Sequence, residues 1–298
     1  MGTSKQFSGI LVVLVTPLQA DETLDEGALR SLLRRVLLAR VHGVVVLGSA
    51  GEFAALTDDQ KRAVIAVAAE EIDGRVPLIV GTGEPGTRRA VQMTHAAKSL
   101  GADAALVVPP YYYRPDTEAV LRYYRTVASE GGLPVLLYNI PFFTKVSLEL
   151  DIVQTLAAEP GIVGIKDSSG NLRSFQELTS TVKSDGFSVV TGSDNTLFAQ
   201  LVAGGDGCIS PGANLVPDWF VELWEAMQHD RWAEAWELQL KIQALHRGIG
   251  FGTFPAGIKG ALSLLGIGQN VMAAPNVPVT AKQMETIEST LHELGLLE

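Results

Sequence analysis

Short apolar runs alternate with longer amphipathic stretches along most of the chain. The runs are rich in valine, leucine and isoleucine with little polar alternation, which is typical of strands buried on both faces. They lie at residues 10–15, 43–47, 77–80, 104–108, 134–138, 162–165, 188–190 and 207–209. Apolar residues at helical spacing predict helices between them, near 25–39, 58–72, 86–100, 116–129, 148–157, 171–183 and 194–203.

Buried strands joined by crossover helices predict an α/β protein, specifically a parallel (β/α)8 TIM barrel. An open, doubly wound sheet is the alternative. The strand signal stops after about residue 225, and helical patterns follow near 231–247, 255–266 and 280–295. We therefore expect a barrel domain over residues 1–225, which holds the active site, and a C-terminal helical extension over residues 226–298.

Composition narrows the class of protein. The chain has 298 residues, of which 47% are hydrophobic and 19% charged, so it can bury a large core. Its net charge of −10 and the lack of a long basic cluster argue against nucleic acid or an acidic membrane surface as partner. The apolar run at 10–15 is too short for a membrane span. The single cysteine, Cys208, can form no intrachain disulfide, which predicts a reducing, cytoplasmic compartment. Because it lies in an apolar strand, we expect a buried thiol.

The candidate chemistry centres on Lys166, which ends the apolar run at 162–165 and precedes a polar, glycine-ended turn. In a (β/α)8 barrel the active site lies at the carboxyl ends of the strands. An amine there is partly desolvated, and desolvation disfavours the charged ammonium form. A neutral amine can attack a carbonyl and form a Schiff base. The alternative is a lysine that reaches the rim of the barrel and pairs with Asp167.

Other strand ends add candidate groups. Tyr138 ends the preceding strand, so its phenol could relay a proton to the same substrate, or its ring could simply cap the core. The small turn at 48–51 has backbone N–H groups that could hold a carboxylate, or it could be an ordinary loop. The tyrosines at 111–113 predict a packing patch at a subunit contact.

Some patterns favour no further chemistry. Residues 81–86 fit G-x-G-x-x-G, but the acidic residue at the right spacing, Asp103, lies at the wrong end of its strand for a dinucleotide site. The histidines are scattered without metal-ligand spacing, so we expect surface or packing residues, no metal and no cofactor. Lys259 also has apolar neighbours, but it follows the barrel strands and ranks below Lys166.

Together, the motifs at 48–52, 110–112, 138–141, 164–166 and 204–210 resemble the class I aldolase family of dihydrodipicolinate synthase and N-acetylneuraminate lyase, over nearly the whole chain. The resemblance implies a Schiff base between Lys166 and pyruvate or another 2-oxo acid. It implies that Tyr138 transfers the proton, that Ser49 and Tyr112 complete a relay, and that Ser49, Ala50 and Ile209 line the pyruvate pocket. It also implies a homotetramer, a dimer of dimers, in which Tyr112 reaches across the dimer contact.

The chain departs from the family pattern at the acceptor side of the site. Phe143 stands where dihydrodipicolinate synthases carry an arginine that holds the carboxylate of aspartate semialdehyde. Ala50 replaces a threonine of the strand-end turn. Asp194 matches an acidic ligand of sugar hydroxyls in neuraminate lyases, but Asn195 replaces the glutamate that follows it.

The sequence therefore predicts a pyruvate-type class I Schiff-base lyase, an aldolase or dehydratase of a 2-oxo acid such as a 2-oxo-3-deoxy sugar acid. The substrate would meet Phe143 as an apolar wall and Asp194 as a hydroxyl ligand. The alternative enzyme is a 4-hydroxy-tetrahydrodipicolinate (dihydrodipicolinate) synthase, which condenses pyruvate with aspartate semialdehyde. The non-catalytic alternative is a binding barrel without turnover, which the pair Lys166 and Tyr138 disfavours.

Overall fold

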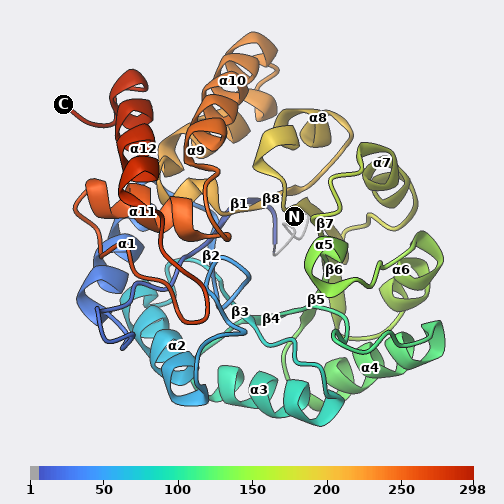
Figure 1. Cartoon of the computed structure of the whole chain (residues 1–298). Coiled ribbons are helices and arrows are strands. Elements are labelled where there is room, and N and C mark those ends of the chain that lie inside the picture. The colour runs from blue at the N-terminus through green and yellow to red at the C-terminus, as the bar shows by residue number, and fades with distance from the viewer. Residues whose placement is uncertain (1–6) are drawn as a thin grey trace.

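Eight parallel strands form the centre of the molecule in a computed structural model that describes residues 7–298 (Figure 1). The strands pair in chain order, and β8 pairs back with β1, so the sheet closes. The predicted TIM barrel is confirmed, and the alternative of an open sheet is wrong. The strands are β1 (Gly9–Val13), β2 (Gly43–Val46), β3 (Leu78–Gly81), β4 (Ala104–Val107), β5 (Val135–Asn139), β6 (Ile162–Asp167), β7 (Ser188–Thr191) and β8 (Gly207–Ser210).

Helices surround the barrel at nearly all the predicted positions (Figure 1). The outer helices are α1 (Glu26–Leu38), α2 (Asp58–Ile72), α3 (Thr87–Ser99), α4 (Thr117–Glu130), α6 (Leu150–Ala157), α7 (Leu172–Thr181), α8 (Leu197–Val202) and α9 (Pro217–Gln228). Short helical turns, α5 (Pro141–Thr144), η1 (Asp194–Thr196) and η2 (Gly212–Asn214), follow β5, β7 and β8. The sequence analysis missed α5 and α9. Proline at the first position of each was a usable start signal.

The C-terminal helices α10 (Trp232–Ile249), α11 (Ala256–Leu264) and α12 (Ala281–Glu293) pack together beside α9 on one side of the barrel, so the predicted extension is present (Figure 1). The boundary expected at residue 225 falls inside α9. The division into two domains stays a prediction. None of the helices within residues 7–298 combines the length and apolar character needed to span a bilayer.

A buried ion pair ties this C-terminal region to the barrel. Lys259 Nζ on α11 lies 2.6 Å from Glu52 Oε1 in the turn after β2, and both side chains are 2% exposed. The backbone N–H of Ala273 donates to the other carboxylate oxygen of Glu52. Burial lowers the pKa of Lys259, and the charge of Glu52 opposes that shift. The amine of Lys259 is therefore already engaged within its own chain.

The glycine pattern at 81–86 has a packing role. A Cβ on Gly83 would lie 2.7 Å from the backbone nitrogen of Val108, and a Cβ on Gly81 would collide with the carbonyl oxygen of Leu47. These glycines therefore allow β3 to lie close to the chain that continues from its neighbours β2 and β4.

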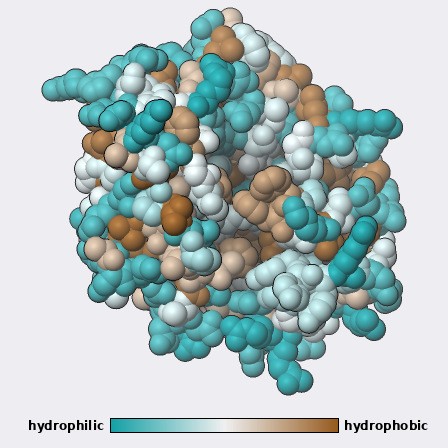
Figure 2. Space-filling model, viewed as in Figure 1, coloured by the Kyte–Doolittle hydropathy of each residue, from teal (hydrophilic) through white to brown (hydrophobic). Residues whose placement is uncertain are grey.

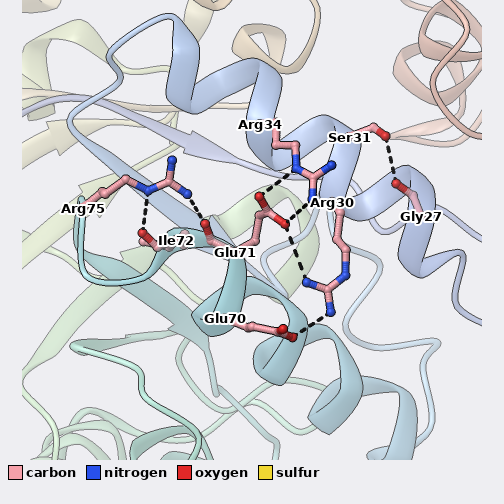
Figure 3. Close-up of polar contacts among 8 residues, drawn as sticks. All are labelled: Gly27, Arg30, Ser31, Arg34, Glu70, Glu71, Ile72 and Arg75. Carbon is pink, nitrogen blue, oxygen red and sulfur yellow. Dashed lines mark hydrogen bonds and ion pairs between the residues drawn. The ribbon is translucent and has the colours of Figure 1, made fainter.

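Charged side chains connect the outer helices α1 and α2 (Figure 3). Arg30 lies 2.7 Å from Glu70, and Arg34 lies 2.8 Å from Glu71. The side-chain hydrogen bonds with Arg34 and Arg30 lower the pKa of Glu71. Because exposed ion pairs are screened by solvent, they contribute little to stability. Arg34 and Glu71 lie near the C-terminal ends of helices that run antiparallel to the strands, so this cluster is at the end of the barrel opposite to the strand carboxyl ends.

Candidate active site

Lys166 lies at the carboxyl end of β6 and faces a cavity of about 520 Å³. Figure 2 shows a hollow with apolar residues around it in the middle of one face. Lys166 is only 3% exposed, and it forms no ion pair within residues 7–298. Asp167 points elsewhere, because its carboxylate accepts hydrogen bonds from Asn139 Nδ2 and Ser169 Oγ. Burial raises the pKa of Asp167. The alternative of a Lys166–Asp167 ion pair is therefore not observed.

Tyr138 on β5 is the register partner of Lys166, so the two side chains leave adjacent parallel strands side by side. Lys166 Nζ lies 4.2 Å from the centroid of the Tyr138 ring. The phenol oxygen of Tyr138 lies 3.3 Å from Ser49 Oγ. The structure thus brings together an amine, a phenol and a hydroxyl that the sequence analysis selected from three separate strands.

The turn after β2 carries Ser49 and Ala50, which both line the cavity. Their backbone N–H groups form no hydrogen bond with the described part of the chain, whereas the next residue, Gly51, donates to the carbonyl of Gly48. Glu52, at φ +56°, holds the end of the turn through its ion pair with Lys259. Two free N–H groups on a fixed turn can receive a carboxylate.

Asp194 in η1 lies in the same cavity but already has partners. Its Oδ2 accepts hydrogen bonds of 2.8 Å from His246 Nε2 and from the backbone N–H of Gly212. Burial opposes a charge on His246, but the hydrogen bond and charge of Asp194 outweigh it and raise the pKa of His246. Asp194 Oδ1 and Ser168 Oγ are buried without a partner among the described residues. These two atoms can meet polar groups of a substrate.

An apolar wall faces these polar groups. Phe142, Phe143 and Phe254 all line the cavity. The Phe143 ring lies 5.1 Å from the Phe142 ring and 6.4 Å from the Phe254 ring, between centroids, and Phe143 is 47% exposed. Lys166 and His246 are the basic residues that line this cavity within residues 7–298. Among the described residues, no arginine lines this cavity to bind a second carboxylate.

Sequence reasoning missed His246 and Phe254. His246 was expected to be a surface or packing residue; it is partly buried with Asp194 as its hydrogen-bond partner, and it also lines the cavity. Both residues come from the C-terminal region, where no strand-end rule marks the site. A histidine in the last turn of an otherwise apolar helix face was the available signal.

Two predicted site residues lie outside this cavity. Tyr112 is 87% exposed in the loop after β4, where its backbone has φ +78°, a conformation that bulky side chains rarely adopt. Its ring contacts that of Tyr113 at 5.0 Å between centroids. Ile209 is fully buried in β8 and does not line the cavity. The roles of Tyr112 in a relay and of Ile209 in the pyruvate pocket stay predictions.

Gly192, directly after β7, leaves the space that Lys166 occupies. A Cβ at this position would lie 2.6 Å from Lys166 Cε and would collide with Ser168 Oγ. We expect Gly192→Ala to displace the amine and to slow the Schiff-base formation that the sequence predicts for Lys166 roughly 10–100-fold, since small misplacements of reacting groups have large effects. Rapid-quench borohydride trapping measures this rate. Gly186→Ala is the matched control, because a Cβ there meets no atom within 4 Å. An unchanged rate in Gly192→Ala would contradict the stated packing.

Comparison with known proteins identifies the family. The model of the dihydrodipicolinate synthetase family matches residues 6–294. The chain belongs to this family. A 4-hydroxy-tetrahydrodipicolinate synthase from Stenotrophomonas maltophilia is 39% identical over 98% of this chain and 97% of its own length. The family predicted from the motifs is therefore confirmed, and the chain is an enzyme, a carbon–carbon or carbon–oxygen lyase of that family.

Solved structures agree with this assignment. A dihydrodipicolinate synthase from Thermotoga maritima matches with a TM-score of 0.94 and 31% identity. That match covers 98% of this chain and 100% of the other. A chloride-inhibited dihydrodipicolinate synthase from Acinetobacter baumannii, complexed with pyruvate, matches with a TM-score of 0.93 and 32% identity. That match covers 97% of this chain and 99% of the other. The fold similarity thus extends over both the barrel and the C-terminal helices.

Proposed function

We propose that this family member is a pyruvate-type class I Schiff-base lyase, an aldolase or dehydratase of a 2-oxo acid. The observation that carries the proposal is the buried amine of Lys166, which has no ion pair within residues 7–298 and lies beside the ring of Tyr138. Pyruvate is supported as the 2-oxo acid by the Acinetobacter baumannii relative, which was solved in complex with it. The free N–H groups of Ser49 and Ala50 would receive the carboxylate of that acid.

The chemistry follows from these positions. The Lys166 amine attacks the C2 carbonyl of the 2-oxo acid, and loss of water leaves a protonated imine. The imine accepts the electron pair that is released when the C3–C4 bond breaks or when C3 loses a proton. In the first case an aldehyde leaves; in the second, water leaves from C4. The Tyr138 phenol, which contacts Ser49 Oγ, moves the proton in either case.

The acceptor side favours an aldehyde without a carboxylate. Phe143 presents an aromatic ring where a cation would be needed, and no arginine lines the cavity within residues 7–298. The second candidate function is condensation of pyruvate with aspartate semialdehyde. The Stenotrophomonas maltophilia relative, a 4-hydroxy-tetrahydrodipicolinate synthase, favours this second function. Such relatives do not support a lyase of 2-oxo-3-deoxy sugar acids.

The proposal includes a homotetramer in which Tyr112 of one chain reaches the relay of another. It is supported by the exposed rings of Tyr112 and Tyr113, 87% and 79% exposed, on a loop with a strained backbone. Aromatic side chains that are exposed in one chain are typical of subunit contacts.

Borohydride trapping tests the proposed function directly. Incubation with pyruvate and borohydride should add a reduced adduct to Lys166, because a protonated imine is reducible and a free amine is not. Peptide mass mapping locates the adduct. The absence of an adduct, or an adduct on Lys259 instead, would overturn the assignment.

The two candidate functions differ in their response to a cation at position 143. Phe143→Arg should raise kcat/KM for pyruvate with aspartate semialdehyde about 10–100-fold, since a charged hydrogen bond contributes roughly 1.5–3 kcal/mol. Phe143→Leu is the control, because it removes the ring and adds no charge. Efficient condensation of aspartate semialdehyde by the unmodified enzyme would make the synthase the leading function.

A further inference from the structure

Three polar side chains on one face of α10 hold the segment that follows β7. Gln239, Gln243 and His246 are spaced by four and three residues, which places them on the same side of a helix. Helix α10 packs against η1 and α8, and it lies beside α8 in Figure 1. A C-terminal helix therefore reaches the acceptor side of the candidate active site.

Gln239 and Gln243 fix the backbone of this segment. Gln239 is 1% exposed; its Nε2 donates to the carbonyl of Asp194 over 2.9 Å, and its Oε1 accepts from the N–H of Phe198 over 2.7 Å. Gln243 Nε2 donates to the carbonyl of Asn195 over 2.9 Å. Neither η1 nor α8 has a side-chain cap of its own among the described residues, so these contacts from α10 take that place.

His246 contacts the side chain of Asp194 and not its backbone. A carboxylate oxygen can only accept a hydrogen bond, so the 2.8 Å contact places a proton on His246 Nε2. The same oxygen, Asp194 Oδ2, also accepts from the backbone N–H of Gly212 over 2.8 Å. A Cβ on Gly212 would lie 2.7 Å from this oxygen and 2.9 Å from His246 Nε2, so glycine leaves the room that the pair needs. Two donors thus hold one carboxylate oxygen in a fixed place.

The other carboxylate oxygen of Asp194 has no such partner. Asp194 Oδ1 is buried and forms no hydrogen bond with the described part of the chain, and the whole side chain is 1% exposed. Asp194 and His246 both line the cavity of Lys166. A buried carboxylate oxygen that has lost water and gained no donor is unfavourable, so a ligand that donates to it is stabilised.

The charge of the pair selects the kind of donor. Protonated His246 and ionised Asp194 together carry no net charge, and neutral His246 leaves the pair negative. Neither state attracts a carboxylate, whereas Asp194 Oδ1 accepts a hydrogen bond from a hydroxyl in both. An uncharged hydroxyl group is therefore the partner that suits this oxygen.

We propose that His246 is a positioning residue for the acceptor end of the substrate: it orients Asp194 Oδ1 toward a substrate hydroxyl, and α10 thereby sets the specificity of the site. This inference rests on the proposed function. His246 acts through Asp194 and not on the reacting atoms, so its removal should weaken the contact with the hydroxyl and leave the Schiff base on Lys166 intact.

The test compares two substrates that differ in one hydroxyl group, 4-hydroxy-2-oxopentanoate and 4,5-dihydroxy-2-oxopentanoate, with release of pyruvate as the readout. We expect the added hydroxyl to raise kcat/KM of the unmodified enzyme roughly 10–100-fold, the scale of a hydrogen bond to a charged group. An enzyme that traps pyruvate but gains nothing from the added hydroxyl, whether it cleaves both acids or neither, would overturn the inference alone. Failure to trap pyruvate would overturn the proposed function and the inference with it.

Two substitutions separate positioning from packing. His246→Phe keeps a ring and removes the donor to Asp194, so it should lower kcat/KM for the dihydroxy acid at least about 10-fold, mainly through KM, and leave pyruvate trapping and the other acid within about twofold. His246→Gln returns an amide N–H near the position of Nε2 and should recover most of this loss. An unchanged preference in folded His246→Phe, or equal losses in both variants, would overturn the inference.

The matched control is His229→Phe. His229 is exposed at the end of α9, where its Nδ1 contacts the carbonyl of Glu225, so the preference should stay within about twofold of the unmodified enzyme. Gly212→Ala is the second variant if His246→Phe does not fold, because its Cβ would displace the pair and keep the imidazole. It should give the same loss of preference for the dihydroxy acid. A folded Gly212→Ala enzyme that keeps the preference would overturn the inference.

Discussion

Lys166→Ala is expected to give no reduced adduct with pyruvate and to lower turnover by roughly 10⁴-fold or more, the scale seen when a covalent catalytic group is removed. Lys166 lies beside Tyr138 in the cavity. Within residues 7–298 no other lysine lines this cavity, so no second amine can replace it. The measurements are adduct mass, pyruvate release and the thermal unfolding temperature, which shows that the variant folds.

The matched control for this substitution is Lys145→Ala. Lys145 is an exposed amine near the mouth of the cavity, where its Nζ donates to the carbonyl of Phe142. Its removal should leave trapping and turnover within about twofold, since exposed substitutions rarely have large effects. Lys259 is a poorer control, because its loss would leave Glu52 buried without a counter-ion, at a cost of about 3–5 kcal/mol. Trapping that persists in Lys166→Ala would contradict the proposed mechanism.

Tyr138→Phe is expected to lower kcat roughly 10²–10⁴-fold, the usual contribution of a positioned proton-transfer group. The substitution removes the hydroxyl that contacts Ser49 Oγ and keeps the ring beside Lys166 Nζ. Adduct formation with pyruvate should therefore stay measurable while release of product becomes slow. Single-turnover kinetics separate the two steps. Near-normal turnover would show that the ring only packs the mouth of the barrel.

Tyr124→Phe controls for the loss of a buried phenol. Tyr124 on α4 donates a 3.0 Å hydrogen bond to the carbonyl of Val107, and it does not line the cavity of Lys166. Its substitution should lower the free energy of unfolding by about 1 kcal/mol and leave kcat unchanged. An equal loss of kcat in both variants would point to a packing role for Tyr138.

The barrel was predictable because its strands are short apolar runs bounded by glycine and polar turns. The strand-end rule then selected Lys166, Tyr138, Ser49 and Asp194, which the structure places in one cavity. The direction in which each strand side chain points was harder to predict. A strand sends alternate residues to opposite faces, and Ile209 lies in the core, where the choice of face depends on the barrel as a whole.

The rest of the site could not be read from local patterns. His246 reaches the cavity from the last turn of α10, and Phe254 reaches it from the segment that follows this helix. Both positions depend on long-range packing of the C-terminal region against the barrel, which no local spacing encodes. The proposed role of Tyr112 also depends on long-range packing, because its ring is 87% exposed and would act at a contact between chains. Helix α9 was missed although its starting proline and the helical spacing of its buried Phe220 and Leu223 both mark it.

The pairing of Glu52 with Lys259 also orders events during synthesis. The two residues are 207 positions apart, and ribosomes add about 5–20 residues per second, so roughly 10–40 s separate their appearance. During that interval the turn with Ser49 carries a carboxylate that lacks its counter-ion. A nascent chain can therefore contain Lys166 before the turn opposite it is held in place. The site is therefore complete only after the C-terminal helices are made, because Lys259 on α11 and Ala273 hold the turn through Glu52.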